Sequence, residues 1–203
     1  MHPWEKIYKQ DKFRITTLEP SVVVKENDAI FSDNTKVLDI GCGNGRNTIF
    51  LAKKGCMVEA IDLVNLDWIY GLNRSLRERI NFQKIDIDNF DWNNKKYDVV
   101  LLLRIMQYLS FDQLQSLIKN IQIHLMDQGF LLLSYVRKGG IQNKFEIDVP
   151  KFSHDIMHIR ELLKKYFVHI HISKGATSSI HVEYNEPIES YDIICSKSVK
   201  MLR

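Results

Sequence analysis

The chain has 203 residues, the size of one ordinary domain with a single substantial core, so we expect residues 1–203 to form one domain. Hydrophobic residues make up 45% of the chain and charged residues 26%, a profile that excludes an intrinsically disordered protein. The formal net charge is only +3 and the lysines and arginines are scattered. We therefore expect no nucleic-acid partner, because phosphate binding favours a concentrated basic surface.

The first 35 residues contain aromatic side chains but no strand pattern, and we expect a helical lead-in or lid over residues 1–35. Their opening, MHPWEKIYKQDKF, lacks the apolar core of a signal peptide. No apolar run in the chain approaches membrane-spanning length, and the three cysteines form no CxxC pair. We therefore expect a cytoplasmic protein with no membrane partner, no disulfide framework and no bound metal.

Seven short runs rich in β-branched residues and leucine follow the lead-in. They span residues 36–41, 57–62, 80–86, 97–104, 129–136, 167–173 and 190–196. Most of them alternate with helical patterns, which is typical of parallel strands joined by crossover helices. The last two have no helical pattern between them and should pair antiparallel through a loop at roughly residues 174–189. We therefore predict an α/β fold with a seven-stranded mixed sheet, helices on both faces and an antiparallel last strand.

Two helices between these runs have clear signals. The first begins at Ser110, with Gln113 completing a capping box, and Gly129 is expected to end it in a left-handed conformation. Its apolar residues repeat at steps of three and four, namely Leu114, Leu117, Ile118, Ile121 and Leu125. The second helix is predicted from after Ser153 to about Tyr166.

The segment VLDIGCGNGRN, residues 37–47, runs from an apolar strand through three glycines into a helical pattern. Gly41, Gly43 and Gly45 let the backbone turn tightly and approach a ligand closely, because they have no Cβ atom. This strand-turn-helix context indicates a cofactor site. The dinucleotide fingerprint is GxGxxG, whereas here the third glycine comes one residue early and Arg46 takes its place. A nicotinamide cofactor is therefore disfavoured.

The pattern D/E-x-G-x-G-x-G, here residues 39–45, resembles the first motif of the class I S-adenosylmethionine-dependent methyltransferases. Within that class, GCGxGRN at residues 41–47 is similar to the small tellurite-resistance and thiopurine-type enzymes. The resemblance covers most of the chain. It implies a Rossmann-like fold, S-adenosyl-L-methionine as cofactor, S-adenosyl-L-homocysteine as product, and in-line methyl transfer to a small-molecule acceptor.

The resemblance also assigns cofactor residues to the carboxyl ends of successive strands, where α/β sheets bind ligands. Asp62 ends the second strand and would accept hydrogen bonds from the two ribose hydroxyls. Asp86 and Ile87 end the third strand and would bracket the adenine, with Asp88 as a nearby rival. The whole predicted cofactor set is Asp39, Gly41, Cys42, Gly43, Asn44, Gly45, Asp62, Leu63, Asp86, Ile87, Leu103 and Arg104.

The acceptor side is predicted from two segments. Leu103, Arg104 and Gln107 follow the end of the fourth strand and should border the sulfonium. His181, in SSIHVEY, by resemblance faces the acceptor and is the candidate general base, while the alternative is a solvated loop histidine. The relatives often follow this histidine with a basic residue, whereas here the loop reads HVEYNEPIE, which disfavours tellurite as the acceptor.

Four further histidines have simpler interpretations. His154 and His158 stand four apart in HDIMH and are similar to the HExxH zinc helix, but they sit at a helix start and lack a third ligand. His169 and His171 share one face of a strand, as an exposed sheet face would explain.

Two alternatives remain open for the chain as a whole. One is an RNA or protein methyltransferase of the same fold, and the other is a non-catalytic cofactor-binding module. The sequence leaves the methylated atom, O, N, S or a metalloid, and the oligomeric state undetermined, because a fold does not determine a substrate.

Overall fold

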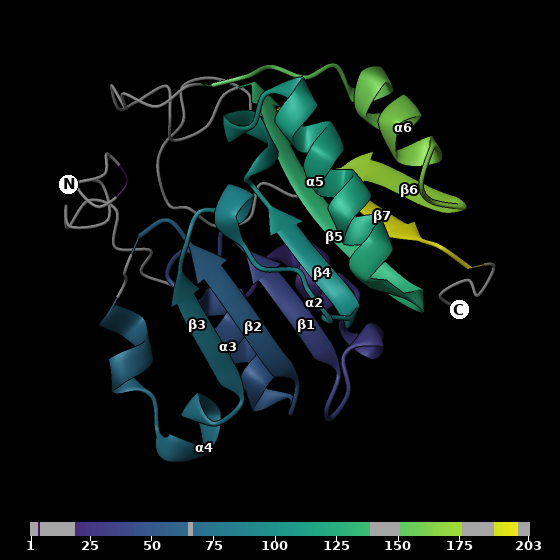
Figure 1. Ribbon diagram of the computed structural model, residues 1–203. Helices are drawn as coiled ribbons and strands as arrows, with labels where there is room; N and C mark the ends of the chain where they lie inside the picture. The colour runs from purple at the N-terminus through teal and green to yellow at the C-terminus, as the bar shows by residue number, and fades with distance from the viewer. Residues whose placement is uncertain (1–3, 5–18, 65–66, 139–150, 176–188, 199–203) are drawn as a thin grey trace. The chain divides into compact units, whose positions relative to one another are not determined.

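The computed structural model describes Trp4 and residues 19–64, 67–138, 151–175 and 189–198. Within these residues a seven-stranded mixed sheet has the order β3-β2-β1-β4-β5-β7-β6 (Figure 1), which confirms the predicted fold class. The strands are β1 (Lys36–Ile40), β2 (Met57–Asp62), β3 (Ile80–Lys84), β4 (Tyr97–Leu103), β5 (Leu125–Lys138), β6 (His169–Lys174) and β7 (Glu189–Ser196). The α-helices are α2 (Val22–Glu26), α3 (Arg46–Lys53), α4 (Arg74–Arg77), α5 (Phe111–His124) and α6 (Ile156–Lys164). Short 3-10 turns are η2 (Asp28–Ile30), η3 (Asp67–Gly71), η4 (Ile87–Asn89) and η5 (Met106–Tyr108).

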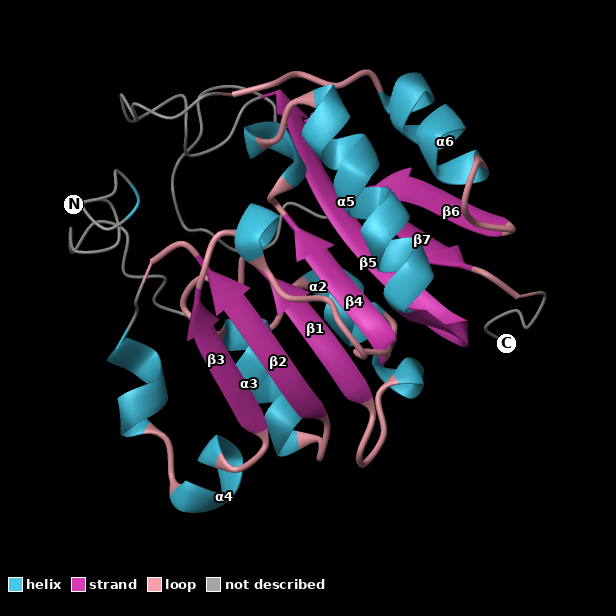
Figure 2. Cartoon of the chain, viewed as in Figure 1, coloured by secondary structure: helices cyan, strands magenta, loops and turns pink. Residues whose placement is uncertain are grey.

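The described residues up to Asp91 form one compact unit, built on the parallel strands β1, β2 and β3. Val37 pairs with Val58, and Val58 with Ile80. In β1 every residue after Lys36 is buried, as expected for a parallel strand covered on both faces, and α3 packs against β2. The carboxyl ends of these three strands lie side by side at one edge (Figure 2).

The described residues from Trp92 onward form a second compact unit. Its strands β4 and β5 are parallel, whereas β7 runs antiparallel to both β5 and β6. The helix α5 packs against β5, and α6 packs against β6. The antiparallel pairing of β6 and β7 confirms the prediction made from the missing crossover helix. No helix in the described part of the chain is long and apolar enough to cross a membrane.

Both predicted helices are present, and their starts are fixed by side-chain caps. The Ser110 N–H donates to Oε1 of Gln113 at 3.0 Å, and the Gln113 N–H donates to Oγ of Ser110 at 3.3 Å, so the predicted capping box is confirmed. The helix α6 begins slightly later than predicted, because Asp155 is its N-cap and accepts a hydrogen bond from the Met157 N–H at 2.7 Å.

The predicted role of Gly129 as the left-handed end of α5 is wrong. The helix ends at His124, and Gly129 lies inside β5. A Cβ atom at Gly129 would stand 2.8 Å from the carbonyl oxygen of Asp98. The β4–β5 register shifts at this point, between Tyr97 and Val99. The glycine therefore lets two strand backbones approach closely at an irregularity, which no local pattern could reveal.

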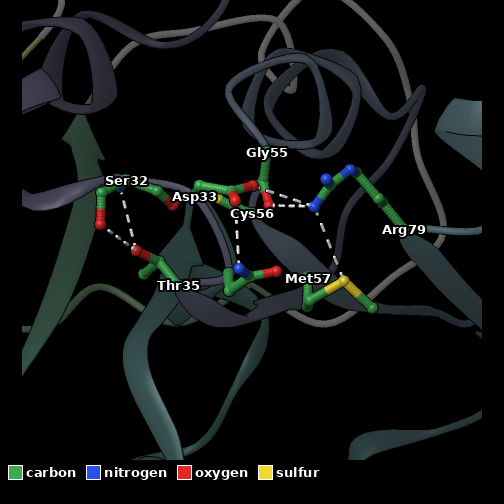
Figure 3. Close-up of polar contacts among 8 residues, drawn as sticks. Ser32, Asp33, Thr35, Gly55, Cys56, Met57 and Arg79 are labelled. Carbon is green, nitrogen blue, oxygen red and sulfur yellow. Dashed lines mark hydrogen bonds and ion pairs between the residues drawn. The ribbon is translucent and has the colours of Figure 1, made fainter.

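A polar cluster lies at the amino ends of the first three strands (Figure 3). Arg79 donates to the carbonyl oxygen of Gly55 and forms an ion pair with Asp33 at 3.3 Å. Beside them the Cys56 thiol donates to the Ser32 carbonyl at 3.5 Å, and burial raises the pKa of Cys56 to about 11. One cation thus holds together the loops that precede β1 and β2.

Gly55 should be sensitive to the addition of a single methyl group. Its φ is +92°, and a Cβ atom there would lie 2.3 Å from Oδ1 of Asp33. We expect Gly55→Ala to lower the free energy of unfolding by about 1–3 kcal/mol, since it adds left-handed strain and displaces the partner of Arg79. Urea denaturation measures the loss. The matched control is Gly71→Ala, where a Cβ atom meets nothing within 4 Å, and equal effects of the two substitutions would contradict the explanation.

Candidate cofactor site

The turn after β1 requires all three of its glycines. The φ angles of Gly41, Gly43 and Gly45 are 69°, 55° and 74°, in the left-handed region that residues with a Cβ atom avoid. The N–H groups of Gly41 and Cys42 both donate to the carbonyl oxygen of Ile61, at 2.8 Å and 3.1 Å. The turn is therefore held against the end of β2 and enters α3 through Gly45.

Asp62 joins the glycine turn to the end of β2 through its side chain. Its Oδ2 atom accepts a hydrogen bond from the Gly43 N–H at 2.8 Å, and its Oδ1 atom accepts one from the Val64 N–H at 3.1 Å. The side chain is half-buried. An ionised carboxylate can accept about four hydrogen bonds in all, so this group can position the turn and also present oxygen to hydroxyl groups of a ligand.

Asp39, the acidic residue that opens the motif, lies deep in the structure. Its side chain is 1% exposed, and Oδ2 accepts a hydrogen bond from Oγ1 of Thr48 at 2.6 Å. Burial raises the pKa of Asp39 to about 6, the Thr48 hydrogen bond opposes this shift, and the charge of Asp62 adds to it. Asp39 is therefore a buried acid coupled to the carboxylate of Asp62.

The remaining residues predicted in the first unit differ in what their side chains offer. Cys42 is buried, desolvation raises the pKa of its thiol well above the usual value, and the thiol donates to the Gly43 carbonyl oxygen at 3.9 Å. Leu63 is 38% exposed although it is large and apolar. Asp86 is exposed and caps η4 by accepting a hydrogen bond from the Asp88 N–H at 3.0 Å, while Ile87 is half-buried.

Arg46 and Asn47, which complete the glycine motif, have a role that the residue pattern did not predict. Nη2 of Arg46 donates to Oγ of Ser21 at 3.0 Å. Oδ1 of Asn47 accepts a hydrogen bond from the Ser21 N–H at 2.8 Å. Ser21 is the N-cap residue of α2. The motif therefore attaches the preceding helix to the start of α3, and the polar pair Arg46–Asn47 directly after the glycines was the signal that could have suggested such a contact.

The predicted cofactor residues are divided between the two units. Asp39, the glycine turn, Asp62 and the pair Asp86–Ile87 all belong to the first unit and lie at the carboxyl ends of β1, β2 and β3 (Figure 2). Leu103 and Arg104 lie at the end of β4 in the second unit. His181 lies outside the described residues.

The histidine pair of HDIMH does not form a zinc helix. His154 precedes α6, whereas His158 lies on the helix and is exposed. His154 is 6% exposed, and its Nε2 atom lies 3.1 Å and 2.9 Å from the carbonyl oxygens of Met106 and Leu109. Since carbonyl oxygens only accept, this nitrogen carries a proton and donates to both. His154 therefore has a structural role, since it ties the segment before α6 to the turn after β4.

The other histidine pair is not uniformly exposed. On β6, His171 is exposed as predicted, but His169 is half-buried. The described residues contain no group of three or more metal-ligating side chains that could hold an ion.

The first unit offers the chemistry that an adenosine cofactor with an amino-acid tail requires. Three positions without a Cβ atom let a ligand approach the backbone, a half-buried carboxylate can accept from hydroxyl groups, and an exposed leucine beside it can contact an aromatic base. These residues fit an adenosine with an amino-acid tail.

Comparisons with known proteins give a family and a fold. Residues 1–172 match the family model described as tellurite resistance protein TehB. A ubiquinone biosynthesis O-methyltransferase of Rickettsia bellii is 24% identical over 180 residues, which span 80% of this chain and 74% of that protein.

Two solved structures share the fold at low sequence identity. A TehB-like SAM-dependent methyltransferase from Corynebacterium glutamicum has a TM-score of 0.66 at 16% identity, over 97% of this chain and 98% of that one. A 1,6-didemethyltoxoflavin-N1-methyltransferase from Burkholderia thailandensis, with 1,6-didemethyltoxoflavin and S-adenosylhomocysteine bound, has a TM-score of 0.71 at 17% identity, over 97% and 87%.

Asp39 should make stability depend on pH in a window set by its pKa. Because burial raises that pKa to about 6 from 3.8, the folded chain binds the proton more tightly than the unfolded chain. Asp39 therefore favours folding increasingly as the pH falls from about 6 to about 4, and its buried charge opposes folding above that window. We expect the stability of Asp39→Asn relative to the wild type to drop by about 1–3 kcal/mol between pH 7 and pH 4.

Urea denaturation of the unliganded proteins across this pH range measures the difference. The control is Glu26→Gln, which removes an exposed carboxylate on α2. A difference between Asp39→Asn and the wild type that stays constant with pH would contradict the assignment.

Proposed function

This chain belongs to the family of tellurite resistance protein TehB and is an S-adenosylmethionine-dependent methyltransferase, and from that premise we propose that it methylates a small molecule by in-line displacement. The observation that carries the cofactor side of the proposal is the left-handed glycine turn bound to the Asp62 carboxylate. The acceptor side rests on the names of similar proteins, among them a ubiquinone biosynthesis O-methyltransferase and a 1,6-didemethyltoxoflavin-N1-methyltransferase.

In the proposed site each residue of the first unit has a distinct task. The Asp62 carboxylate accepts hydrogen bonds from the ribose hydroxyls, while Asp86 and Ile87 bracket the adenine. The backbone of residues 41–45 receives the methionine portion, with Asp39 beneath it. Leu103 and Arg104, at the end of β4, complete the proposed cofactor set.

The chemistry requires alignment more than proton transfer. Bound S-adenosylmethionine supplies a methyl group made electrophilic by the adjoining sulfonium. The chain aligns an acceptor atom behind that methyl group and excludes water, and such positioning contributes about 7–11 kcal/mol in favourable cases. Where the acceptor atom carries a proton that it will not lose unaided, we propose His181 as the general base.

Asp62→Asn tests the cofactor assignment. This substitution leaves an oxygen for the Gly43 N–H but replaces the second acceptor with a donor, so we expect the affinity for S-adenosylhomocysteine to fall about 10–100-fold. Isothermal titration calorimetry measures the dissociation constants. Asp88→Asn is the control, since Asp88 is an exposed neighbour that should affect binding less than about threefold.

Two outcomes would contradict the cofactor assignment. Absence of binding to the wild type would refute the cofactor site itself. A loss confined to Asp88→Asn would leave Asp62 without its assigned ribose contact and would move the acidic contact at the end of the third strand from Asp86 to its rival Asp88.

A labelled methyl group shows whether the acceptor is a small molecule or a macromolecule. The purified chain is incubated with methyl-labelled cofactor and a cell extract. We expect the label in the low-molecular-mass fraction, and treatment with nuclease or protease should not change the molecular mass of the labelled product. We expect His181→Ala to slow this transfer about 100-fold, whereas His171→Ala, on an exposed strand position, should match the wild type. Label retained in RNA or protein would support a macromolecular methyltransferase of the same fold.

A further inference from the structure

The side chain of Gln107, in η5 after β4, holds a buried polar atom that has no structural role described so far. It is 4% exposed, and its Nε2 atom donates to the Arg104 carbonyl oxygen at 2.7 Å. That contact fixes the orientation of the amide, since only its NH2 group can donate to a carbonyl. The Oε1 atom is buried and has no hydrogen-bond partner among the residues that the structure describes.

The segment that carries Gln107 is held rigidly from the other side. The Phe152 N–H donates to the Gln107 carbonyl oxygen at 2.8 Å. Nε2 of His154 donates to the carbonyl oxygens of Met106 and Leu109, which flank Gln107. The backbone on both sides of Gln107 is therefore fixed. The amide could turn its Oε1 atom toward another partner only by losing the hydrogen bond to the Arg104 carbonyl.

Backbone strain marks the same segment independently. Arg104 has φ of 61°, and the two other described non-glycine residues with positive φ are Asn34 and Asn94. Asparagine tolerates the left-handed region, whereas arginine rarely adopts it. The Arg104 N–H still donates to the Ser134 carbonyl oxygen at 2.8 Å. Strain held in place by such contacts is characteristic of ligand sites.

We propose that Oε1 of Gln107 accepts a hydrogen bond from an N–H or O–H group of the methyl acceptor, and that it selects acceptors carrying such a group over capped or anionic compounds. This inference rests on the proposed small-molecule methyl transfer. A buried acceptor atom discriminates strongly, because a ligand without the donor leaves that atom unpaired in a desolvated site. A carbonyl oxygen of this kind also repels an oxyanion.

Paired probes test the selection without a known substrate. The full chain is first saturated with S-adenosylhomocysteine, and its affinity is then measured for catechol against its dimethyl ether and for aniline against N,N-dimethylaniline. We expect the donor-bearing member of each pair to bind the wild type at least about tenfold more tightly. Gln107→Met should reduce this ratio below about threefold and leave the affinity for S-adenosylhomocysteine unchanged. The exposed glutamine on α5 provides the control, Gln115→Met, which should keep the wild-type ratio.

A second variant separates recognition from a purely structural role and serves if Gln107→Met does not fold. Gln107→Glu keeps an acceptor oxygen, which accepts at least as strongly as the amide oxygen, but when ionised it loses the donation to the Arg104 carbonyl. We therefore expect Gln107→Glu to keep the preference for donor-bearing probes at neutral pH. A purely structural role depends on the donation to the Arg104 carbonyl and predicts that Gln107→Glu loses the ratio as Gln107→Met does.

Several results would overturn the proposal. The wild type could bind both members of each pair equally or bind neither, or Gln107→Met could keep the wild-type ratio. A weakened affinity of Gln107→Met for S-adenosylhomocysteine would assign the hydrogen bond to the cofactor instead. Failure of the wild type to bind S-adenosylhomocysteine would refute the proposed function at the first step, before any probe is added, and the role of Gln107 with it.

Discussion

The hydrogen bond from the Gly43 N–H to the Asp62 carboxylate, 2.8 Å long, is the interaction on which the first unit's site depends. Together with the N–H groups of Gly41 and Cys42, which donate to the Ile61 carbonyl oxygen, it holds a turn of three left-handed glycines against the end of β2. A charged acceptor makes a stronger bond than a neutral one. The same carboxylate can then both shape the turn and contact the ligand, so folding and binding use one group.

This arrangement places two acids close together at the expense of stability. Asp39 is fully buried behind the turn, and the charge of Asp62 contributes to the raised pKa of Asp39. Arg46 lowers that pKa while it also donates to Ser21. The arginine that breaks the dinucleotide fingerprint therefore offsets the acidic charge and attaches the preceding helix. A strained, charged carboxyl edge is consistent with a site shaped for binding.

The opposite end of the first unit and the core of the second show the contrasting, structural use of polar groups. Arg79 satisfies the Gly55 carbonyl and pairs with Asp33, so this cluster is complete in itself (Figure 3). In the second unit His154 donates to two carbonyl oxygens and stacks near the ring of Phe152. Gln107 differs from both, because one of its buried polar atoms is left without a partner in the described part of the chain.

The sequence by itself determined the features that depend on neighbours along the chain. These are the strand runs, the capping box at Ser110 and the glycine turn, because periodicity, caps and left-handed residues are local properties. It also placed Asp62 at a strand end, and the family resemblance gave the cofactor. Only the tertiary structure decided the roles of Gly129, Asn47, His154 and Gln107. Each role arises from a contact with residues distant in sequence, such as the β4 backbone opposite Gly129 or the carbonyl oxygens that receive the His154 proton. Such contacts exist only after the strands have paired, so no spacing within the sequence encodes them.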